Sequence, residues 1–388
     1  MKWPMEKLGI VAPAKPIKSP KIADSNSVWL LNLDMVESHT GRVIEKLFCS
    51  ADEAGTSTHW FDENYVLYSK LRPYLNKVVV PDGLGLATTE LVPLLPDPER
   101  LDKNYLAYYL RSEQFVRWVN EQVAGAKMPR VSMKIFWEHE IPLPPLEEQK
   151  RIVTILDKAD TIRQKRQQAI ALADDFLRSV FLDMFGDPVT NPKGWPQVEI
   201  SSLCSDIVDC VNRTAPSVDY QTPYKMVRTT NVKNREINLS DVKFADKETY
   251  ENWIRRLKPK RGDIIFTREA PAGEAGIVNT DDLIFLGQRT MHFRPNLLEA
   301  KPSYLLYELT SSGVQQQIVR CSAGSTVTHL SVPECKKFII RKPSIALQEK
   351  FEKHYSMSLN MKANARNALQ LSEQVFFSLS QIAFSGQL

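Results

Sequence analysis

The chain carries one long segment twice. Residues 105–185 and 304–384 align without a gap at a constant offset of 199 positions. A period of this length indicates a duplicated domain, because solenoid repeats recur every ~20–50 residues. Two similar but non-identical modules suit the recognition of two unlike halves of one long ligand. The identical pairs include Tyr105/Tyr304, Leu106/Leu305, Tyr108/Tyr307, Gly125/Gly324, Ser132/Ser331, Pro144/Pro343, Gln149/Gln348 and Phe185/Phe384.

The composition is that of an ordinary globular protein. Of 388 residues, 43% are hydrophobic and 25% are charged, which supports about two to three domains with their own cores. No apolar run approaches the ~18 residues of a membrane span, and the N-terminus lacks the apolar region of a signal peptide. The five cysteines are odd in number and contain no C-x-x-C pair, which predicts reduced thiols. We expect a cytoplasmic protein with no membrane partner.

The charge distribution does not by itself indicate DNA binding. The net charge is +4, with 17 basic and 18 acidic residues in 1–146 and 22 basic and 18 acidic residues in 187–345. A free-standing DNA-binding protein usually has a stronger basic excess. If this chain binds nucleic acid, either partners neutralise many phosphates or the basic residues gather on one face.

We predict an α+β fold of two tandem modules and two long helices. The first module covers residues 1–145 and the second covers residues 187–343, with helices over 146–186 and 344–388. Turn-forming Pro and Gly residues separate strand-like runs in both modules. Strands are expected at 28–33, 66–68, 77–80, 91–95, 224–227, 263–266, 276–278 and 283–285, and a helix near 104–122.

The two long helices are expected to pair antiparallel as a coiled coil. Residues 147–185 contain neither Pro nor Gly, and apolar residues recur there at heptad spacing around a polar middle at Arg163 and Arg166. A pair of such helices would hold the two modules at a fixed spacing. The alternative, a long helix lying on a globular core, remains open.

Several motifs together resemble one protein family. One motif is the turn-rich linker that follows the first long helix. The other motifs lie in the two modules and at the start of that helix. The motifs are Phe185-Gly186-Asp187-Pro188 with Asn191-Pro192-Lys193-Gly194-Trp195, Gly262–Glu269, Leu286–Arg289, Gly324-Ser325-Thr326 with Leu330-Ser331, Pro144–Gln149, and Lys70–Lys77 with Thr88–Glu90. Over essentially its whole length, the chain resembles the specificity (S) subunits of type I restriction–modification systems.

This resemblance implies a non-catalytic DNA-recognition subunit. Each module would be a target-recognition domain that reads one half of a bipartite sequence in double-stranded DNA. The long helices would dock two methyltransferase (M) subunits, and motor-nuclease (R) subunits would join them. No cofactor would be bound by this chain, because S-adenosylmethionine belongs to the M subunits and ATP and Mg²⁺ to the R subunits.

The residues themselves offer no catalytic or metal site. Asn191-Pro192 is followed by Lys-Gly, so it fails the Asn/Asp-Pro-Pro-aromatic motif of adenine methyltransferases, and residues 271–276 form no phosphate-binding glycine pattern. Asp263 and Glu269 could suggest a nuclease carboxylate pair, but the first copy has Tyr65 and Leu71 at these positions. The six histidines show no metal-ligand spacing.

Candidate DNA-binding residues are those whose side chains can pair with base edges. Arg and Lys suit guanine, while Asn and Gln suit adenine, although many basic residues contact only phosphates. The small, polar stretch at 324–329 could approach a groove or could be a structural turn. The candidates are Lys70, Arg72, Tyr74, Lys77, Lys127, Arg130, Arg228, Thr230, Asn231, Arg268, Gln288, Arg289, Ser325, Thr326 and His329.

Candidate partner-binding residues lie on the two long helices. The outer face of a paired helix favours partner docking over DNA contact. The candidates are Ile152, Leu156, Arg163, Arg166, Ile170, Leu177, Phe351, Tyr355, Leu369 and Phe376. Because the modules differ in their loops, we expect an asymmetric target. The alternative is a non-catalytic scaffold or regulatory decoy that binds methyltransferase subunits.

Overall fold

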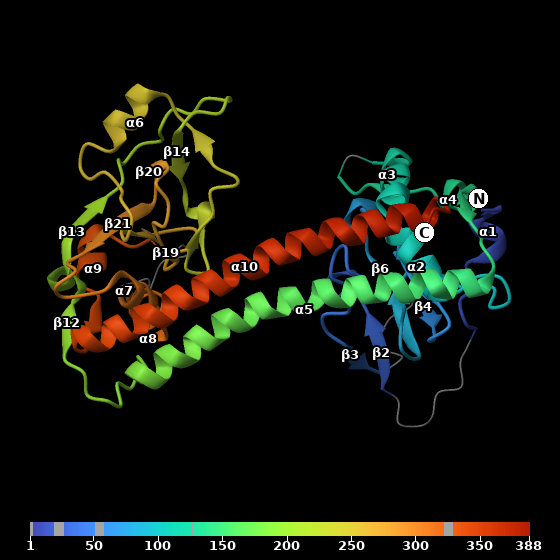
Figure 1. The fold of residues 1–388 in the computed structure, drawn as a ribbon, viewed down its shortest axis with the longest axis horizontal. Coiled ribbons are helices and arrows are strands. Elements are labelled where there is room, and N and C mark those ends of the chain that lie inside the picture. Colours follow the sequence, from blue (N-terminus) through green and yellow to red (C-terminus); the bar gives the residue numbers. More distant parts are fainter. Residues whose placement is uncertain (1–2, 19–26, 51–57, 126, 322–328) are drawn as a thin grey trace. The chain divides into compact units, whose positions relative to one another are not determined.

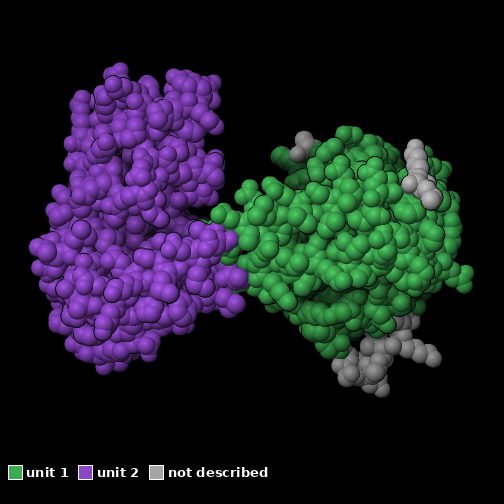
Figure 2. All heavy atoms as spheres, viewed as in Figure 1, with its two compact units in different colours: residues 1–168, 365–388 green, residues 169–364 purple. Residues whose placement is uncertain are grey.

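The computed structural model describes residues 3–18, 27–50, 58–125, 127–321 and 329–388. Two compact units make up the chain. Unit 1 joins residues 1–168 to residues 365–388, and unit 2 spans residues 169–364 (Figure 2). Each unit therefore contains one of the two modules and a part of each long helix.

Unit 1 contains two small sheets with strand orders β3-β2-β7-β4 and β6-β5-β8. In the first sheet β2 runs parallel to β7, and in the second β5 pairs antiparallel with β8. A separate pair of strands, β1 and β11, brings the start and the end of the module together. The strands are β1 (Met5–Lys7), β2 (Val28–Leu31), β3 (Leu47–Cys49), β4 (Thr58–Phe61), β5 (Val66–Ser69), β6 (Val78–Val79), β7 (Gly85–Thr88), β8 (Leu91–Leu94), β9 (Val123–Ala124), β10 (Arg130–Val131) and β11 (Glu140–Pro142).

The helix predicted near 104–122 is two helices. Ser112 interrupts it with extended backbone (φ −66°, ψ 148°), and its hydroxyl accepts a hydrogen bond from the Phe115 N–H at 3.3 Å. A serine in this role caps a new helix, and this local bond competes with continued helix. The module's helices are α1 (Leu8–Val11), α2 (Lys103–Arg111), α3 (Glu113–Glu121) and α4 (Met133–Glu138), with 3₁₀ turns at Leu33–Met35 and Pro73–Leu75.

Unit 2 repeats this plan with the same set of sheets: one of four strands, one of three strands and two separate strand pairs. Its sheets have the orders β13-β21-β18-β19 and β17-β14-β20, and the strand pairs β12-β22 and β15-β16 accompany them. As in unit 1, one strand pair is parallel (β14 and β20), and the strands β18 and β21 pair antiparallel. The strands are β12 (Gln197–Glu199), β13 (Cys204–Asp209), β14 (Tyr224–Val227), β15 (Val232–Lys233), β16 (Glu236–Ile237), β17 (Lys243–Phe244), β18 (Ile264–Thr267), β19 (Ala275–Ile277), β20 (Leu283–Leu286), β21 (Thr290–Pro295) and β22 (Ile339–Arg341).

The helices of the second module are short. They are α6 (Lys247–Trp253), α7 (Pro302–Leu309), α8 (Ser312–Cys321) and α9 (Val332–Lys336), with 3₁₀ turns at Ile200–Leu203 and Thr229–Asn231. Each strand predicted from the sequence overlaps an observed strand, and the fold is a mixture of helices and sheets, as predicted.

The two predicted long helices are present as α5 (Leu146–Phe185) and α10 (Ile345–Phe384), each 40 residues long (Figure 1). Within unit 1 they contact each other, since the Arg163 guanidinium lies 4.8 Å from the ring centre of Phe376. Within unit 2 the Ser358 hydroxyl donates to the Ala173 carbonyl at 3.2 Å. No helix in the described part of the chain is long and apolar enough to cross a membrane.

The last turn of a long helix completes the core of each module. In unit 1 Phe384 of α10 packs against Tyr105, with ring centres 5.4 Å apart. In unit 2 Phe185 of α5 packs against Tyr304 at 4.8 Å. All four rings are at most 5% exposed. The core of the first module thus depends on the end of α10, which is distant from it in the sequence. The core of the second module depends on the end of α5, which directly precedes it.

One glutamine holds each module to the start of the long helix that follows it. The Gln149 side chain accepts a hydrogen bond from the Asp102 N–H and donates to the carbonyls of Arg100 and Pro144, all at 2.8 Å. The Gln348 side chain makes the same three bonds with the backbone of Lys301, Glu299 and Pro343. Both glutamines are fully buried, so these bonds satisfy groups that have no access to water.

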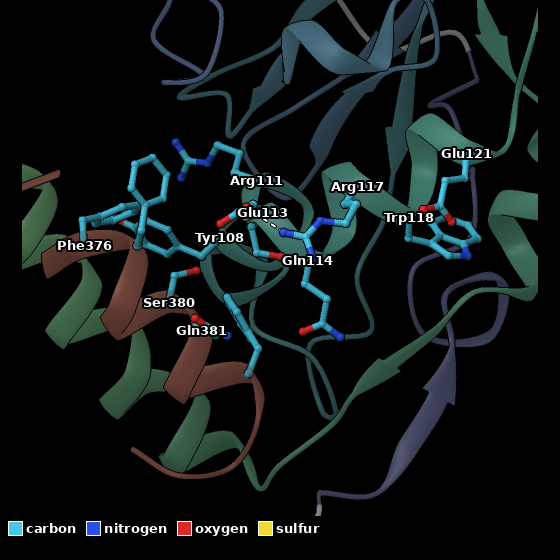
Figure 3. A pocket seen from close by; sticks show the side chains of 13 residues that line it. Tyr108, Arg111, Glu113, Gln114, Arg117, Trp118, Glu121, Phe376, Ser380 and Gln381 are labelled. Carbon is cyan, nitrogen blue, oxygen red and sulfur yellow. Dashed lines mark hydrogen bonds and ion pairs between the residues drawn. The ribbon is translucent and has the colours of Figure 1, made fainter. Parts of the chain in front are cut away.

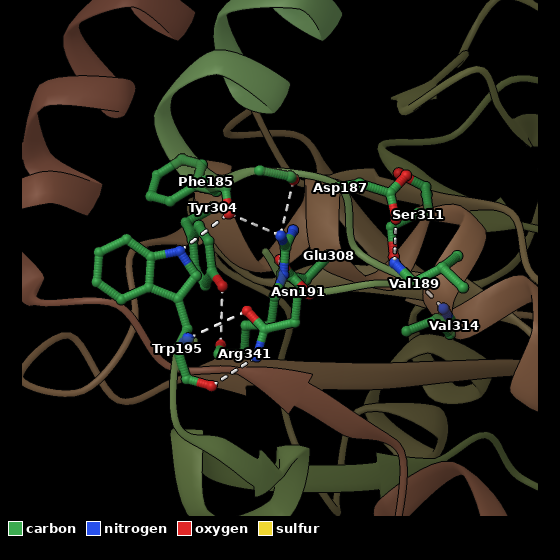
Figure 4. Close-up of polar contacts among 12 residues, drawn as sticks. Phe185, Asp187, Val189, Asn191, Trp195, Tyr304, Glu308, Ser311, Val314 and Arg341 are labelled. Atoms are coloured by element: carbon green, nitrogen blue, oxygen red, sulfur yellow. Dashed lines mark hydrogen bonds and ion pairs between the residues drawn. The ribbon is translucent and has the colours of Figure 1, made fainter. Parts of the chain in front are cut away.

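The carboxyl ends of the two long helices are also capped in the same manner. Trp195 donates its indole N–H to the Phe185 carbonyl at 2.9 Å, and Trp3 donates to the Ala383 carbonyl at 3.4 Å. Unit 2 adds a buried arginine, Arg341, which donates to the carbonyls of Phe185 and Gly186 (Figure 4). These contacts satisfy carbonyls that a helix end leaves without a partner.

Candidate nucleic-acid interface

In unit 1, three segments meet at one end of the β5–β8 pair. We call this place corner 1 (residues 70–72, 90 and 129–131). The Lys70 N–H donates to the Glu90 carbonyl at 3.0 Å, and the Lys70 carbonyl accepts from the Val131 N–H at 3.1 Å. The Arg72 N–H donates to the Pro129 carbonyl at 2.8 Å. The structure therefore brings Lys70 and Arg72 together with Arg130, which is distant from them in the sequence.

The basic side chains of corner 1 face solvent. Arg130 pairs with Glu90 at 2.9 Å, and both Arg72 and the nearby Lys127 are exposed. Arg72 adopts a left-handed backbone conformation (φ 48°) just before the turn that carries Tyr74, whose ring is 45% exposed. Three arginine and lysine side chains against one carboxylate give this corner a basic character that suits phosphate contact.

Lys77 is placed differently from the other basic candidates of the first module. Its ammonium group donates to the Leu33 carbonyl at 2.6 Å, and burial lowers the pKa of the lysine. The side chain ties the approach to β6 to the 3₁₀ turn after β2. Lys77 therefore makes an internal contact that holds two segments of the first module together.

Unit 2 contains an equivalent place, corner 2 (residues 228, 268–269, 287–289 and 329–330). The Arg268 N–H donates to the Arg289 carbonyl at 2.8 Å, and the Arg268 carbonyl accepts from the Leu330 N–H at 3.2 Å. These two bonds are the counterparts of those that Lys70 makes with Glu90 and Val131. Arg228 joins them because β14 and β20 run parallel and end together, with the Gly287 N–H bonded to the Val227 carbonyl.

An exposed charged cluster forms the surface of corner 2. The Glu269 carboxylate pairs with Arg289, whose Nε lies 3.0 Å from it, and also contacts the ring of His329. Arg289 and His329 are 56% and 59% exposed. Gln288 is exposed beside them and accepts a hydrogen bond from the Thr214 hydroxyl at 3.0 Å. Both an arginine and an amide are therefore accessible here, and these are groups that can pair with base edges.

Two candidates of the second module are buried. The Asn231 side chain is 4% exposed. Its amide oxygen accepts from the Arg228 N–H, and its amide nitrogen donates to the carbonyls of Asn238 and Asp241. Arg268 is 7% exposed, donates to the Leu330 carbonyl and pairs with Asp209 at 3.0 Å. Both side chains hold the corner together, so we do not include them among the groups that would touch a ligand.

The remaining candidates of this module divide in two. Thr230 is exposed in the 3₁₀ turn after β14. Ser325 and Thr326 lie outside the described residues. His329 is thus the only one of the three candidates in the 324–329 stretch for which the structure gives a position.

Several candidate partner-binding residues are used inside the protein. Ile152, Leu156, Leu177 and Phe351 are at most 2% exposed and belong to the cores of the two units. Arg163 pairs with Asp160 of its own helix at 2.5 Å. The others are half-buried, namely Arg166, Ile170, Tyr355, Leu369 and Phe376. The heptad pattern therefore identified mainly the inward face of the helices.

Large apolar side chains that face solvent occur at matched positions of α5 and α10. Patch 1 of unit 1 comprises Ile162, Leu371 and Val375, and patch 2 of unit 2 comprises Met361, Leu172 and Phe176. Each residue of one patch is 199 positions from a residue of the other, and all are 48–65% exposed. The candidates chosen from the sequence did not include them. The offset gives the signal, because apolar residues recur at these three positions in both copies.

A groove of about 370 Å³ lies in unit 1 between α3 and the last turns of α10 (Figure 3). Phe376 and Trp118 contribute rings to its wall, and Arg117 pairs with Glu113 at 2.8 Å on its rim. The residues that line it include no cysteine, histidine or lysine that could act as a nucleophile or base.

The titratable groups with large pKa shifts are structural. Burial raises the pKa of the Cys204 and Cys335 thiols to about 12, so they stay protonated and unreactive. Burial disfavours the charge on Asp263, but hydrogen bonds from Arg294 and His292 outweigh it and lower its pKa to about 2. Asp263 and Glu269 lie at opposite ends of β18, so they form no carboxylate pair.

Comparison with known proteins finds relatives of one kind. Residues 61–172 match the model of the type I restriction modification DNA specificity domain. The chain is 26% identical over 181 residues to the specificity subunit of the type I restriction enzyme EcoDI of Escherichia coli, covering 46% of this chain and 40% of that subunit. It is 24% identical over 321 residues to the MjaVIII specificity subunit of Methanocaldococcus jannaschii, covering 78% of this chain and 74% of that subunit.

The fold is also shared with a solved structure. A chain from a structural study of complex assembly and conformational transition in a type I restriction–modification system has a TM-score of 0.58 at 16% identity, covering 100% of this chain and 98% of the other. The specificity domain covers much of the first module, and the MjaVIII relative extends the match over most of the chain. Over most of its length, the chain is thus similar to the specificity subunits of type I restriction–modification systems.

Proposed function

We propose that this chain is the non-catalytic DNA-recognition subunit of a type I restriction–modification complex. Each module would read one half of an asymmetric bipartite target in double-stranded DNA. The observation that carries this proposal is the repetition of one corner with different exposed side chains. Corner 1 presents Arg72 and Arg130, whereas corner 2 presents Gln288, Arg289 and His329. The same backbone would thus display two different sets of base-reading groups.

We infer that the chain arose by duplication and that its long helices form an antiparallel coiled coil. The bounds of α5 and α10 differ by 199 at both ends, since 345 − 146 and 384 − 185 give the same value. In unit 2, Ala173 meets Ser358 and Phe181 meets Phe351, so the chain directions are opposite there. The two modules would be residues 1–145 and 187–343, and the helices would set the spacing between the half-sites.

Patch 1 and patch 2 are the proposed docking sites for two methyltransferase subunits. Exposed apolar groups at matched positions suit one partner type bound twice, because equivalent surfaces bind equivalent partners. Motor-nuclease subunits would join this complex in the cytoplasm. Each half-site would then present an adenine to a methyltransferase, which takes the base out of the stack before it transfers a methyl group.

Methylome sequencing of cells that express this chain with its cognate methyltransferase tests the proposal. We expect one asymmetric bipartite methyladenine motif. Arg289→Ala should degrade the half-site read by the second module, and Arg130→Ala should degrade the other half-site. Arg261→Ala is the matched control, because Arg261 is 53% exposed and pairs with Asp281 at the opposite end of β18.

The outcomes separate the possible functions. If no motif appears although the methyltransferase subunits copurify with the chain, the scaffold or decoy function gains support and DNA recognition fails. If both half-sites degrade equally in Arg289→Ala, the assignment of one module to each half-site is wrong. DNA affinity of the complex should also fall steeply with salt, because lysine and arginine contacts release counterions from DNA.

Helix length can be tested in the same system. Inserting one heptad into α5 and one into α10 should change the number of base pairs between the half-sites, because the helices would set that distance. An unchanged spacer in such a variant would show that the helices do not set the distance between the half-sites.

The docking site can be tested separately. Phe176→Asp should weaken copurification of a methyltransferase subunit, whereas Lys353→Asp, a change at an exposed residue of α10, should not.

A further inference from the structure

Lys362 of α10 is a lysine whose charge is buried within unit 2. Its side chain is 6% exposed, and a buried ammonium group is costly unless it is paired. The Nζ atom lies 2.7 Å from Oδ1 of Asp174 on α5 and 2.5 Å from Oε1 of Glu236 on β16. One side chain therefore links both long helices to a strand of the second module.

The contact with Glu236 is the distinctive one. The helices already meet one turn away, where the Ser358 hydroxyl donates to the Ala173 carbonyl at 3.2 Å. The pair of Lys362 with Asp174 thus adds to an existing helix–helix contact. The pair with Glu236 instead connects the helices to the β15–β16 hairpin, which belongs to the sheet region of the module.

A tight turn and contacts with two helices hold the β15–β16 hairpin in place. Its turn residues, Asn234 and Arg235, both have left-handed backbone (φ 52° and 64°), as a tight two-residue hairpin turn requires. The Arg235 guanidinium lies 4.4 Å from the ring centre of Tyr307 and its Nε donates to the Thr310 hydroxyl at 2.8 Å. The hairpin is therefore held against α7 as well as against α10.

The same hairpin adjoins corner 2. It directly follows the 3₁₀ turn that begins after Arg228, and the Asn238 N–H donates to the Asn231 carbonyl at 2.8 Å. The Asn231 side chain in turn accepts from the Arg228 N–H at 3.0 Å. Arg228 is thus linked to Lys362 through two rigid, hydrogen-bonded segments of the module.

The described residues of unit 1 show a different arrangement. The position equivalent to Lys362 is Arg163, which pairs with Asp160 on its own helix and stacks on Phe376 of α10. These partners belong to the helices, whereas Glu236 belongs to the module. Among the described residues, the short ion pair between this helix position and a strand of the module is the one that Lys362 makes with Glu236 in unit 2.

We propose that Lys362 is a positioning residue that fixes corner 2 relative to patch 2. Met361, the adjacent residue of α10, is 62% exposed in that patch. The proposal rests on the function proposed above, in which corner 2 reads DNA and patch 2 docks a methyltransferase. Without the pair of Lys362 and Glu236, corner 2 would move more freely relative to the docked enzyme. The complex would then tolerate targets whose spacer differs from the native one.

The experiment uses the full complex of this chain with its methyltransferase subunits. Methylation rates are compared on duplexes that carry the native spacer and on duplexes with the spacer one base pair longer or shorter. Lys362→Met should lower the preference for the native spacer by about fivefold, the size of a modest coupling between sites. Glu236→Gln should lower the preference for the native spacer similarly, whereas Lys362→Arg should retain it. Lys353→Met, a change at an exposed lysine of the same helix, should leave the preference unchanged.

A double variant distinguishes positioning from general weakening. If Lys362 acts through Glu236, the variant with both changes should be no worse than either single change. A purely structural role would slow methylation of all duplexes equally and leave the spacer preference intact, which would overturn the proposal. A wild-type complex that methylates no bipartite target would instead contradict the function on which the proposal rests.

Discussion

The end of a long helix meets each module at an equivalent place, and different polar groups occupy it. In unit 1 the Tyr109 hydroxyl and the His139 Nε2 atom share a hydrogen bond of 2.9 Å. At the equivalent positions unit 2 has Glu308 and Phe338, and Glu308 pairs with Arg341 at 2.5 Å. The two sets of side chains fill similar space with a neutral pair in one unit and a charged pair in the other.

Some contacts made with the backbone are the same in both units. Gln149 and Gln348 bond the same three backbone groups, and Tyr105 and Tyr304 each donate a hydroxyl to a strand carbonyl, at 2.9 and 2.8 Å. Backbone groups are present whatever the side chain is, so a partner of the same type can be kept at these positions. Side-chain pairs can be exchanged together, and the two units differ at one such pair.

The largest expected effect comes from breaking the charged pair of unit 2. Arg341→Met should lower the free energy of unfolding by about 3–5 kcal/mol, because it leaves the Glu308 charge buried and unpaired. It also removes the donor for the carbonyls of Phe185 and Gly186. Urea unfolding followed by circular dichroism measures the loss.

A double change provides the control for this prediction. Arg341→Met combined with Glu308→Leu should regain part of the lost stability, since no buried charge remains. If the single variant loses less than about 1 kcal/mol, water must reach Glu308 and the comparison with the neutral pair of unit 1 would be misleading.

The matched glutamines test whether the two units are equivalent. Gln149→Ala and Gln348→Ala should each cost about 2–3 kcal/mol, because each leaves a buried N–H and two carbonyls without a partner. The two losses should agree within about 1 kcal/mol. Urea unfolding of both variants checks this, and Gln167→Ala, an exposed glutamine of α5, is the control. A clearly smaller loss for one variant would break the equivalence.

The sequence predicted the parts of the fold that follow from local pattern. The 39 residues of 147–185 without Pro or Gly predicted α5, and the strand-like runs of both modules were found close to their expected bounds. The break at Ser112 was missed because the apolar spacing continues through it, while one hydroxyl decides the cap.

The sequence proposed candidate site residues by type, and the structure separates them by burial. Arg289 and Arg130 are exposed at matching corners, as a DNA-contacting role requires, and their pairing with Glu269 and Glu90 was not foreseen. Asn231 is an equally plausible base-reading residue in the sequence, yet the fold uses its amide for three internal bonds. Which polar side chain turns inward depends on contacts between distant segments, and no local pattern encodes these.

A change at His139 tests the neutral pair of unit 1. Burial lowers the pKa of His139 to about 4, so between that pH and its ordinary pKa near 6.5 the unfolded chain binds more protons than the folded chain. The contribution of neutral His139 to the stability of unit 1 should therefore be fully present above about pH 6.5. It should be lost progressively as the pH drops toward 4.

Unit 2 supplies the replacement, because its residue at the matching position is Phe338. His139→Phe should cost about 1 kcal/mol at pH 7.5, since the Tyr109 hydroxyl loses its partner. It should also reduce the loss of stability between pH 7.5 and pH 5, as measured by urea unfolding at both values. If the variant and the wild type lose the same stability over this range, another group is responsible for the pH dependence.

The smallest expected effect separates the two tryptophan caps. Trp195→Phe should cost about 1 kcal/mol, because it removes a hydrogen bond of good length, 2.9 Å, to the end of α5. Trp3→Phe should cost roughly half as much, because its bond to the Ala383 carbonyl is 3.4 Å long and correspondingly weak. Hydrogen exchange of the amides in the last turns of α5 and α10 reports each cap separately. Equal protection losses would mean that the longer bond contributes as much as the shorter one and that both helix ends depend on their caps equally.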